Sequence, residues 1–267
     1  MSSPITRAPA VTTTQPQPVS SSAPVTSIQD ALPTRGVRLV NVMIDQPRVR
    51  LCLQGEHTDI TAGYAEASAH VAIRPGTSTA SIALAGDPCH RPFANVHLPD
   101  RAGLSTIVAT GSSHDGSARL TLLTDDFSAP ATGFARARPF HADPEAGVVD
   151  LGRLLGTDTV VRLFTDLRYE HTAAASADPN FNPTTGYASL PAIGGTAVFG
   201  AFRQGTPQQL VEVKGPDFIA GRIFSIYVIG AVLTTVPPAA LLVCDDTDAN
   251  VSSPARCQTF PARVLQP

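Results

Sequence analysis

The sequence of 267 residues has no tryptophan, two methionines and only 15% charged residues. Its formal net charge is −3, so it has no basic field that would attract nucleic acid or an anionic membrane surface. It also lacks any run of about 18 consecutive apolar residues, the length that a membrane-spanning helix requires. We therefore expect no nucleic-acid partner and no transmembrane span.

Proline and glycine are plentiful instead, with 24 and 20 residues, and apolar residues make up 43% of the chain. This composition favours many short strands joined by turns over long helices. The first 30 residues lack the apolar region of a secretory signal, so the sequence fits either a cytoplasmic protein or a mature exported chain. Cysteine usage has to separate these two locations.

Four cysteines are present: Cys52, Cys89, Cys244 and Cys257. They form no C-x-x-C motif and have no histidine at zinc spacing, so we expect no metal and no cofactor. Pairing by neighbourhood predicts the disulfides Cys52–Cys89 and Cys244–Cys257, while four buried reduced thiols are the alternative. We favour disulfides because Cys257 lies in a polar segment, and they imply an extracellular, cell-surface or periplasmic location.

The pattern along the chain predicts a flexible linker or stalk followed by an all-β fold. Residues 1–35 are rich in Pro, Ser, Thr and Gln and lack hydrophobic periodicity, as is typical of such linkers. From Gly36 onward, short alternating segments are separated by turn dipeptides. The expected strands of the first part are 37–42, 48–53, 68–73, 79–84, 105–110 and 118–123.

An internal repeat predicts two similar domains. Residues 41–51 align with 141–151 without a gap, and the later "LTLLTDD" aligns with "ALLVCDD" at an offset of 120, which places Asp126 over Asp246. The difference between the two offsets predicts an insertion in the second copy. The predicted units are β-sandwich repeat 1 at 36–129, β-sandwich repeat 2 at 130–250 with its insertion near 169–187, and a C-terminal tail at 251–267.

Both front segments resemble the signature of a bacterial secreted family of unknown function, DUF4397. In the second copy the matching residues are His141, Ala142, Pro144, Ala146, Val149 and Asp150. In the first copy they are Arg38, Val40, Asp45, Pro47, Val49 and Gly55, with Asn41 at the position of the family's histidine. The resemblance covers about residues 36–246 and implies tandem immunoglobulin-like sandwiches at the cell surface. It supplies no established reaction.

Several polar residues could carry chemistry, but each has a simpler structural role. His141 and Asp150 could form a polar pair, although a histidine that fixes a turn by bonding the backbone explains the same positions. Ser112, His114 and Asp115 are too close in sequence to form a catalytic triad, and a hairpin tip accounts for them. The paired aspartates at 125–126 and 245–246 follow strands and can accept backbone N–H bonds. We expect no catalytic residue.

The insertion holds the one weak metal candidate. Asp178, Asn180 and Asn182 alternate like the start of a calcium loop, but the glycine and the bidentate glutamate of such loops are missing. A plain loop is the favoured interpretation.

These observations predict a non-enzymatic, exported module for adhesion, binding or assembly. Its expected partners are other surface proteins, glycans or copies of itself. The N-terminal segment would serve as a tether or donate a strand to a neighbour. The alternative is an extracellular hydrolase or carbohydrate-binding protein that uses the insertion of repeat 2.

Overall fold

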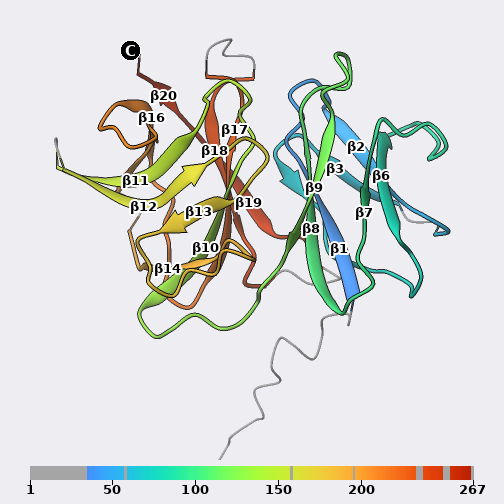
Figure 1. Cartoon of the computed structure of the whole chain (residues 1–267), viewed down its shortest axis with the longest axis horizontal. Helices are drawn as coiled ribbons and strands as arrows, with labels where there is room; N and C mark the ends of the chain where they lie inside the picture. The colour runs from blue at the N-terminus through green and yellow to red at the C-terminus, as the bar shows by residue number, and fades with distance from the viewer. Residues whose placement is uncertain are drawn as a thin grey trace, which may run out of the picture.

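The computed structural model describes residues 35–56, 59–156, 159–194, 196–232, 237–248 and 253–265. Throughout these residues the chain forms strands, turns and loops and contains no helix (Figure 1). Accordingly, they include no helix long and apolar enough to cross a membrane. The predicted all-β sandwich fold is confirmed.

The first half of the chain forms two facing sheets, which we call A and B. Sheet A has the order β4-β1-β8-β9, with β5 also paired to β1, and sheet B has the order β3-β2-β6-β7. The strands are β1 (Arg35–Asn41), β2 (Arg48–Leu53), β3 (Ile60–Gly63), β4 (Glu66–Ala67), β5 (Val71–Ala72), β6 (Thr79–Leu84), β7 (Ala94–His97), β8 (Gly103–Thr110) and β9 (Arg119–Thr124).

The second half forms sheets C and D. Sheet C has the order β14-β10-β17-β18-β19, and sheet D has the order β13-β12-β11-β15-β16-β20. The strands are β10 (Phe134–His141), β11 (Val149–Leu155), β12 (Thr159–Leu167), β13 (Ala173–Ser176), β14 (Ala188–Pro191), β15 (Val198–Arg203), β16 (Gln209–Lys214), β17 (Ile223–Ile229), β18 (Ala240–Asp245), β19 (Arg256–Pro261) and β20 (Arg263–Val264).

The two halves share one strand arrangement. In sheet A, β1 runs parallel to β8 and β8 runs antiparallel to β9. In sheet C, β10 runs parallel to β17 and β17 runs antiparallel to β18. The order of sheet B likewise recurs in β12, β11, β15 and β16 of sheet D. The observed repeat of topology agrees with the internal repeat of the sequence.

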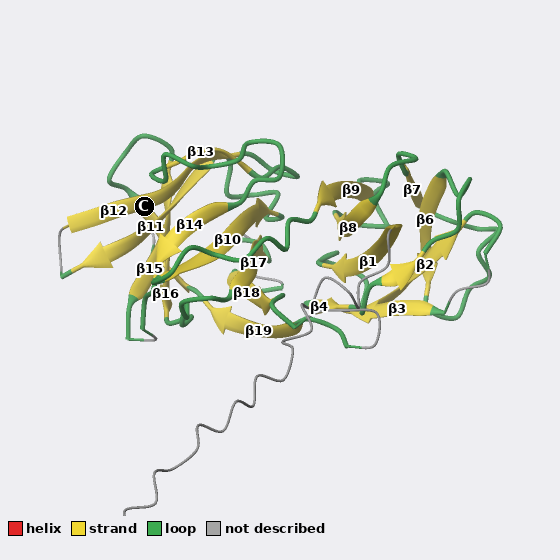
Figure 2. Ribbon diagram, turned by 90° about the horizontal axis from the view of Figure 1, so that it is seen from below, coloured by secondary structure: helices red, strands yellow, loops and turns green. Residues whose placement is uncertain are grey.

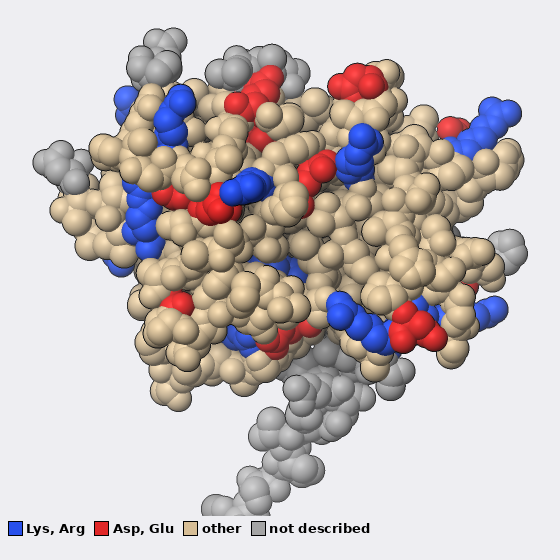
Figure 3. Space-filling view, in the orientation of Figure 1, with Lys and Arg blue, Asp and Glu red and all other residues tan. Residues whose placement is uncertain are grey.

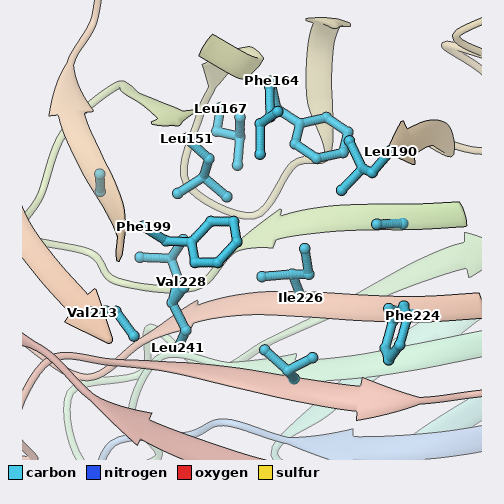
Figure 4. Close-up of a cluster of buried hydrophobic side chains, with 14 of the residues drawn as sticks. Leu151, Phe164, Leu167, Leu190, Phe199, Val213, Phe224, Ile226, Val228 and Leu241 are labelled. Atoms are coloured by element: carbon cyan, nitrogen blue, oxygen red, sulfur yellow. The ribbon is translucent and has the colours of Figure 1, made fainter. Parts of the chain in front are cut away.

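Each sandwich encloses its own apolar core, and alternation along the strands fills it. In β2, Val49, Leu51 and Leu53 point into the first core, whereas Arg48 is exposed. The second core is larger, and Figure 4 shows Phe164, Phe199 and other side chains meeting between sheets C and D. Each fully buried aliphatic or aromatic side chain stabilises the fold by about 1.5–3 kcal/mol.

Most expected strands of the first half are present, and 48–53 and 79–84 coincide with β2 and β6. The expected strand at 68–73 is wrong, because residues 66–72 form the two short strands β4 and β5, with Ser68 to His70 between them. The limit of the linker at residue 35 is also wrong, since β1 already begins at Arg35. The rest of that segment, 1–34, lies outside the described residues.

The predicted C-terminal tail at 251–267 is wrong. Residues 256–261 pair with β18 as strand β19, and residues 263–264 pair with β16 as strand β20. This segment therefore runs from sheet C to sheet D and closes one side of the second sandwich. Its polar composition suggested a tail, but an edge strand needs only one apolar face, which Phe260 and Val264 provide.

Both predicted disulfides are present. Cys52–Cys89 joins β2 to the loop after β6, and Cys244–Cys257 joins directly opposed residues of β18 and β19. No cysteine of the chain remains free. The second bond fixes the C-terminal strand to the sheet.

Candidate functional site

The most elaborate polar site lies between the two sandwiches, where sheet A packs face to face on sheet C (Figure 2). The alternation of β1 explains this contact, because Leu39 points into the first core while Val40 points toward sheet C. From sheet C, Phe140 and Tyr227 meet Val40 in a third buried apolar cluster. Each central sheet is therefore covered on both faces.

Arg38 lies in the middle of this interface and is completely buried. Its guanidinium donates two hydrogen bonds to the carboxylate of Asp246 in the second sandwich, at 2.6 and 2.9 Å. Its Nε donates to Thr106 Oγ1 at 2.8 Å. A bidentate arginine–carboxylate pair of this kind is strong and directional. Here it joins residues that are far apart in the sequence.

A second pair runs in the opposite direction. Arg138 of the second sandwich donates to Asp125 of the first at 2.8 Å, and the side chains of both residues are at most 1% exposed. Arg138 also donates to the backbone carbonyl of Thr124 and stacks its guanidinium over the ring of Tyr187. Each sandwich thus contributes one arginine from its first strand and one aspartate from the end of its β9 or β18 hairpin.

Two hydroxyl groups connect the pairs into a closed ring. Thr106 donates to Asp125, and Ser225 donates to Asp246. Arg138 reaches both hydroxyls at 3.4 Å. With two arginines and two aspartates the ring is electrically balanced, and we call it the interface charge ring.

The electrostatics of the ring keep its groups ionised. Burial alone would lower the pKa of Arg38, but Asp246 beside it raises that pKa well above the ordinary value. Burial would raise the pKa of Asp125, but Arg138, the hydrogen bond from His70 and Arg38 hold it well below its usual range. Removal of either partner would leave an isolated buried charge, so the docked arrangement requires both members of each pair.

The ring is well suited to fixing orientation and poorly suited to catalysis. Arg38, Arg138 and Asp246 are each 0–1% exposed, so no dissolved ligand touches them in this arrangement. The opposed pairs fix both the register and the rotation of sheet A on sheet C. The site therefore specifies one orientation of the two sandwiches.

A broad hollow lies on the outer face of sheet B. It has a volume of about 980 Å³ and its floor includes the Cys52–Cys89 disulfide. Arg50, Glu56 and His90 are among the polar groups around it. It could accept a polar ligand or the side chains of a partner protein.

Comparison with protein families places the first part of the chain. Residues 35–152 match the family model described as a domain of unknown function, DUF4397. The match includes Arg38, Asp125 and Arg138 of the interface charge ring, and it ends in β11 of the second sandwich. No curated protein matches the chain.

His141, the histidine that resembles the DUF4397 signature, has a structural role in the second sandwich. His141 Nε2 donates to the carbonyl of Gly147 at 2.7 Å, and its Nδ1 accepts the amide N–H of Asp143. Burial lowers the pKa of His141 to about 4, although the bond to Gly147 opposes this, so the ring is neutral at pH 7. Asp150 bonds Arg162 and backbone amides instead, so the proposed polar pair with His141 is not formed.

Asn41 fixes the corresponding turn of the first sandwich by bonding the backbone. Its Oδ1 accepts the amide N–H of Met43, and its Nδ2 donates to the carbonyl of Gln46. An amide thus replaces an imidazole: the accepted amide N–H is equivalent, and the carbonyl that accepts is one residue nearer in the sequence. This agrees with the interpretation of the histidine as a turn-fixing residue.

The signature residue Asp45 organises the hairpin tip that contains Ser112, Ser113 and His114. Asp45 Oδ2 accepts hydrogen bonds from both serine hydroxyls and from the amides of Ser113 and His114. His114 is 81% exposed and its ring donates to neither serine. These residues of the DUF4397 domain form a capped loop and no catalytic triad.

In the insertion, the calcium candidates are occupied by backbone bonds. Asp178 accepts the amides of Asn180 and Ser189 through its two oxygens, and Asn182 Oδ1 accepts the amide of Thr184. The described residues contain no group of three or more His, Cys, Asp or Glu side chains that could hold a metal ion. Part of the insertion is also regular structure, since β13 pairs with β12.

Sequence reasoning missed the partners of the paired aspartates. The sequence repeat places Asp126 over Asp246, but the hydrogen bonds make Asp125 the counterpart of Asp246. The amide of Asp125 donates to the carbonyl of Leu104, and the amide of Asp246 donates to the equivalent carbonyl of Ile223. The alignment of Asp126 with Asp246 is therefore wrong by one residue. The sequence holds one signal for these partners, because arginine recurs at 38 and 138, at the same offset of 100 residues as segments 41–51 and 141–151.

Proposed function

We propose that this protein is a non-enzymatic module that works outside the cytoplasm and binds or assembles partners through its outer surfaces. The observation that carries the proposal is the interface charge ring, which joins two disulfide-bonded sandwiches into one rigid scaffold. A rigid scaffold with exposed loops, a polar hollow and strand edges is suited to recognition. Disulfides persist in oxidising compartments, which supports export.

The surface supports protein or glycan partners more than nucleic acid. On the face shown in Figure 3, acidic and basic side chains are interspersed and form no broad basic patch. The alternative of a hydrolase or carbohydrate-binding protein that uses the insertion gains no support from Asp178 and Asn182, whose oxygens bond the backbone. We therefore propose that partners bind at the hollow on sheet B and at the sheet edges.

The test is capture of the partner and inspection of its fate. Immobilised full chain is incubated with the solubilised cell-envelope fraction of the producing organism, and captured material is analysed by mass spectrometry before and after prolonged contact. We expect a specific partner that emerges chemically intact and is lost in the hollow variant Arg50→Glu. The matched control is Arg168→Glu, an exposed arginine of the second sandwich, which should retain capture.

Two results would overturn the proposal. Cleavage of the captured partner or release of sugar fragments would favour the hydrolase. Isolation of the native protein from the cytoplasm with free thiols would contradict export.

A further inference from the structure

The two sandwiches differ at one side, where the second is closed and the first is open. In the second, β19 covers the outer edge of β18 and β20 covers the outer edge of β16. The corresponding strands of the first sandwich are β9 and β7, and each ends its sheet. Among the described residues, no strand pairs with their outer edges.

The open edge of β9 presents backbone groups in a strand-like row. The amide of Asp125 bonds the carbonyl of Leu104, so alternation turns the N–H and C=O groups of Leu120 and Leu122 and the N–H of Thr124 outward. In β18 the equivalent residues Leu241, Val243 and Asp245 lie opposite residues of β19. Within the part of the chain that the structure describes, the first sandwich therefore has an unpaired edge of the same length and polarity as an edge that the second sandwich fills.

The position of β19 indicates where a strand beside β9 would lie. Sheets A and C run in opposite order across the interface, so that β19 contacts β4 at one side (Figure 2). Since β4 at one edge of sheet A lies against β19 of sheet C, a strand added beyond β9 at the other edge of sheet A would face β14 of sheet C. It would gain side-chain contacts there in addition to main-chain hydrogen bonds.

The chain itself contains a segment that fits. Residues 10–15, "AVTTTQ", are six proline-free residues between Pro9 and Pro16, and β9 and β19 are six residues long. Four of the six are β-branched, a composition that favours strands. Residues 16–34 separate this segment from β1, and an extended chain of that length reaches on the order of 60 Å.

We propose that residues 10–15 of a second copy of this chain pair with the open edge of β9. Arg35 enters sheet A at the end where β9 finishes, because both Arg35 and Thr124 lie beside the start of β8. A segment joined to Arg35 by a short connection would run parallel to β9 of its own copy, whereas β19 runs antiparallel to β18. Residues 16–34 are long enough to reach β9 of a neighbouring copy. A neighbouring copy can supply the antiparallel strand. Repeated from copy to copy, this contact builds a head-to-tail assembly.

The inference rests on the assembly role in the proposed function, and its test uses substitutions in the full chain. Thr13→Pro removes a donor from the middle of the segment and leaves the sandwiches untouched. Ser21→Pro is the matched control, because it adds a proline to the same N-terminal segment outside residues 10–15. Mass is measured by light scattering over a range of protein concentrations, and amide exchange is followed at Leu120, Leu122 and Thr124.

We expect the full chain and Ser21→Pro to form multimers whose mass rises with concentration, with these amides exchanging at least about tenfold more slowly than in Thr13→Pro. Thr13→Pro and a chain lacking residues 2–34 should be monomers. A monomeric full chain, multimers that survive Thr13→Pro, or protected amides in a monomer would each overturn the inference. Envelope capture through the hollow would be unaffected, so the proposed function can stand when this inference fails.

Discussion

Replacing Arg38 with methionine removes one cation from the interface charge ring and keeps much of the side-chain volume. The carboxylate of Asp246 then loses two charge-assisted hydrogen bonds, at 2.6 and 2.9 Å, and keeps the bond from Ser225. Because both side chains of the pair are completely buried, water cannot replace the lost partner. Breaking such a pair costs about 3–5 kcal/mol of stability.

The matched control is Arg48→Met, another strand arginine of the first sandwich. Its salt bridge to Glu66 is 3.5 Å long, and both side chains are about half exposed. An exposed pair of this kind contributes less than about 1 kcal/mol. Urea unfolding followed by far-ultraviolet circular dichroism measures both variants, since the chain has no tryptophan for fluorescence.

A double-mutant cycle separates pairing from general damage. Asp246→Leu removes the stranded charge, so Arg38→Met combined with Asp246→Leu should cost at least about 2 kcal/mol less than the sum of the two single variants. The measured quantity is the free energy of unfolding of the wild type, the two single variants and the double variant. Additive effects within about 0.5 kcal/mol, or an Arg38→Met loss no larger than that of Arg48→Met, would refute the reasoning.

Three further outcomes follow from local structure. Between pH 8 and pH 5, the free energy of unfolding of His141→Asn should rise by about 2 kcal/mol relative to that of the wild type. The folded pKa of His141, about 4, lies below the ordinary value near 6.5, so protons bind the unfolded wild type first and destabilise its folded state. A difference in urea unfolding that does not change with pH would contradict this. Replacing Cys244 and Cys257 with alanine should lower the free energy of unfolding by about 3 kcal/mol and speed amide exchange in β19. Unchanged exchange would show that the disulfide is not needed to hold β19. Gly230→Ala should lower the free energy of unfolding by about 1–3 kcal/mol, because Gly230 has a φ of +92° and a Cβ there would collide with the backbone carbonyl of Pro238. An unchanged melting temperature would exclude this strain.

Much of the fold could be predicted because alternation and turn residues are local signals. The segment 48–53 shows strict alternation, and β2 occupies the same residues. The C-terminal strand β19 could not be predicted in this way, because edge strands have a mixed polar sequence. The small strands β4 and β5 also escaped, since their two-residue length is set by pairing with β1.

The site was harder to predict because its contacts are between distant parts of the chain. The turn-fixing role of His141 was accessible from sequence, since its partners are within six residues. The pairing of Arg38 with Asp246 spans both sandwiches and depends on which faces of sheets A and C meet. Periodicity gives the faces of a strand, but it does not say which sheet covers the outer face.

The central claim is that the interface charge ring holds the two sandwiches in one fixed orientation. Residual dipolar couplings of backbone amides in weakly aligned, isotope-labelled protein measure this orientation directly. We expect a single alignment tensor to fit the amides of β1 and β8 together with those of β10 and β17. Two different tensors, one for each sandwich, would contradict it.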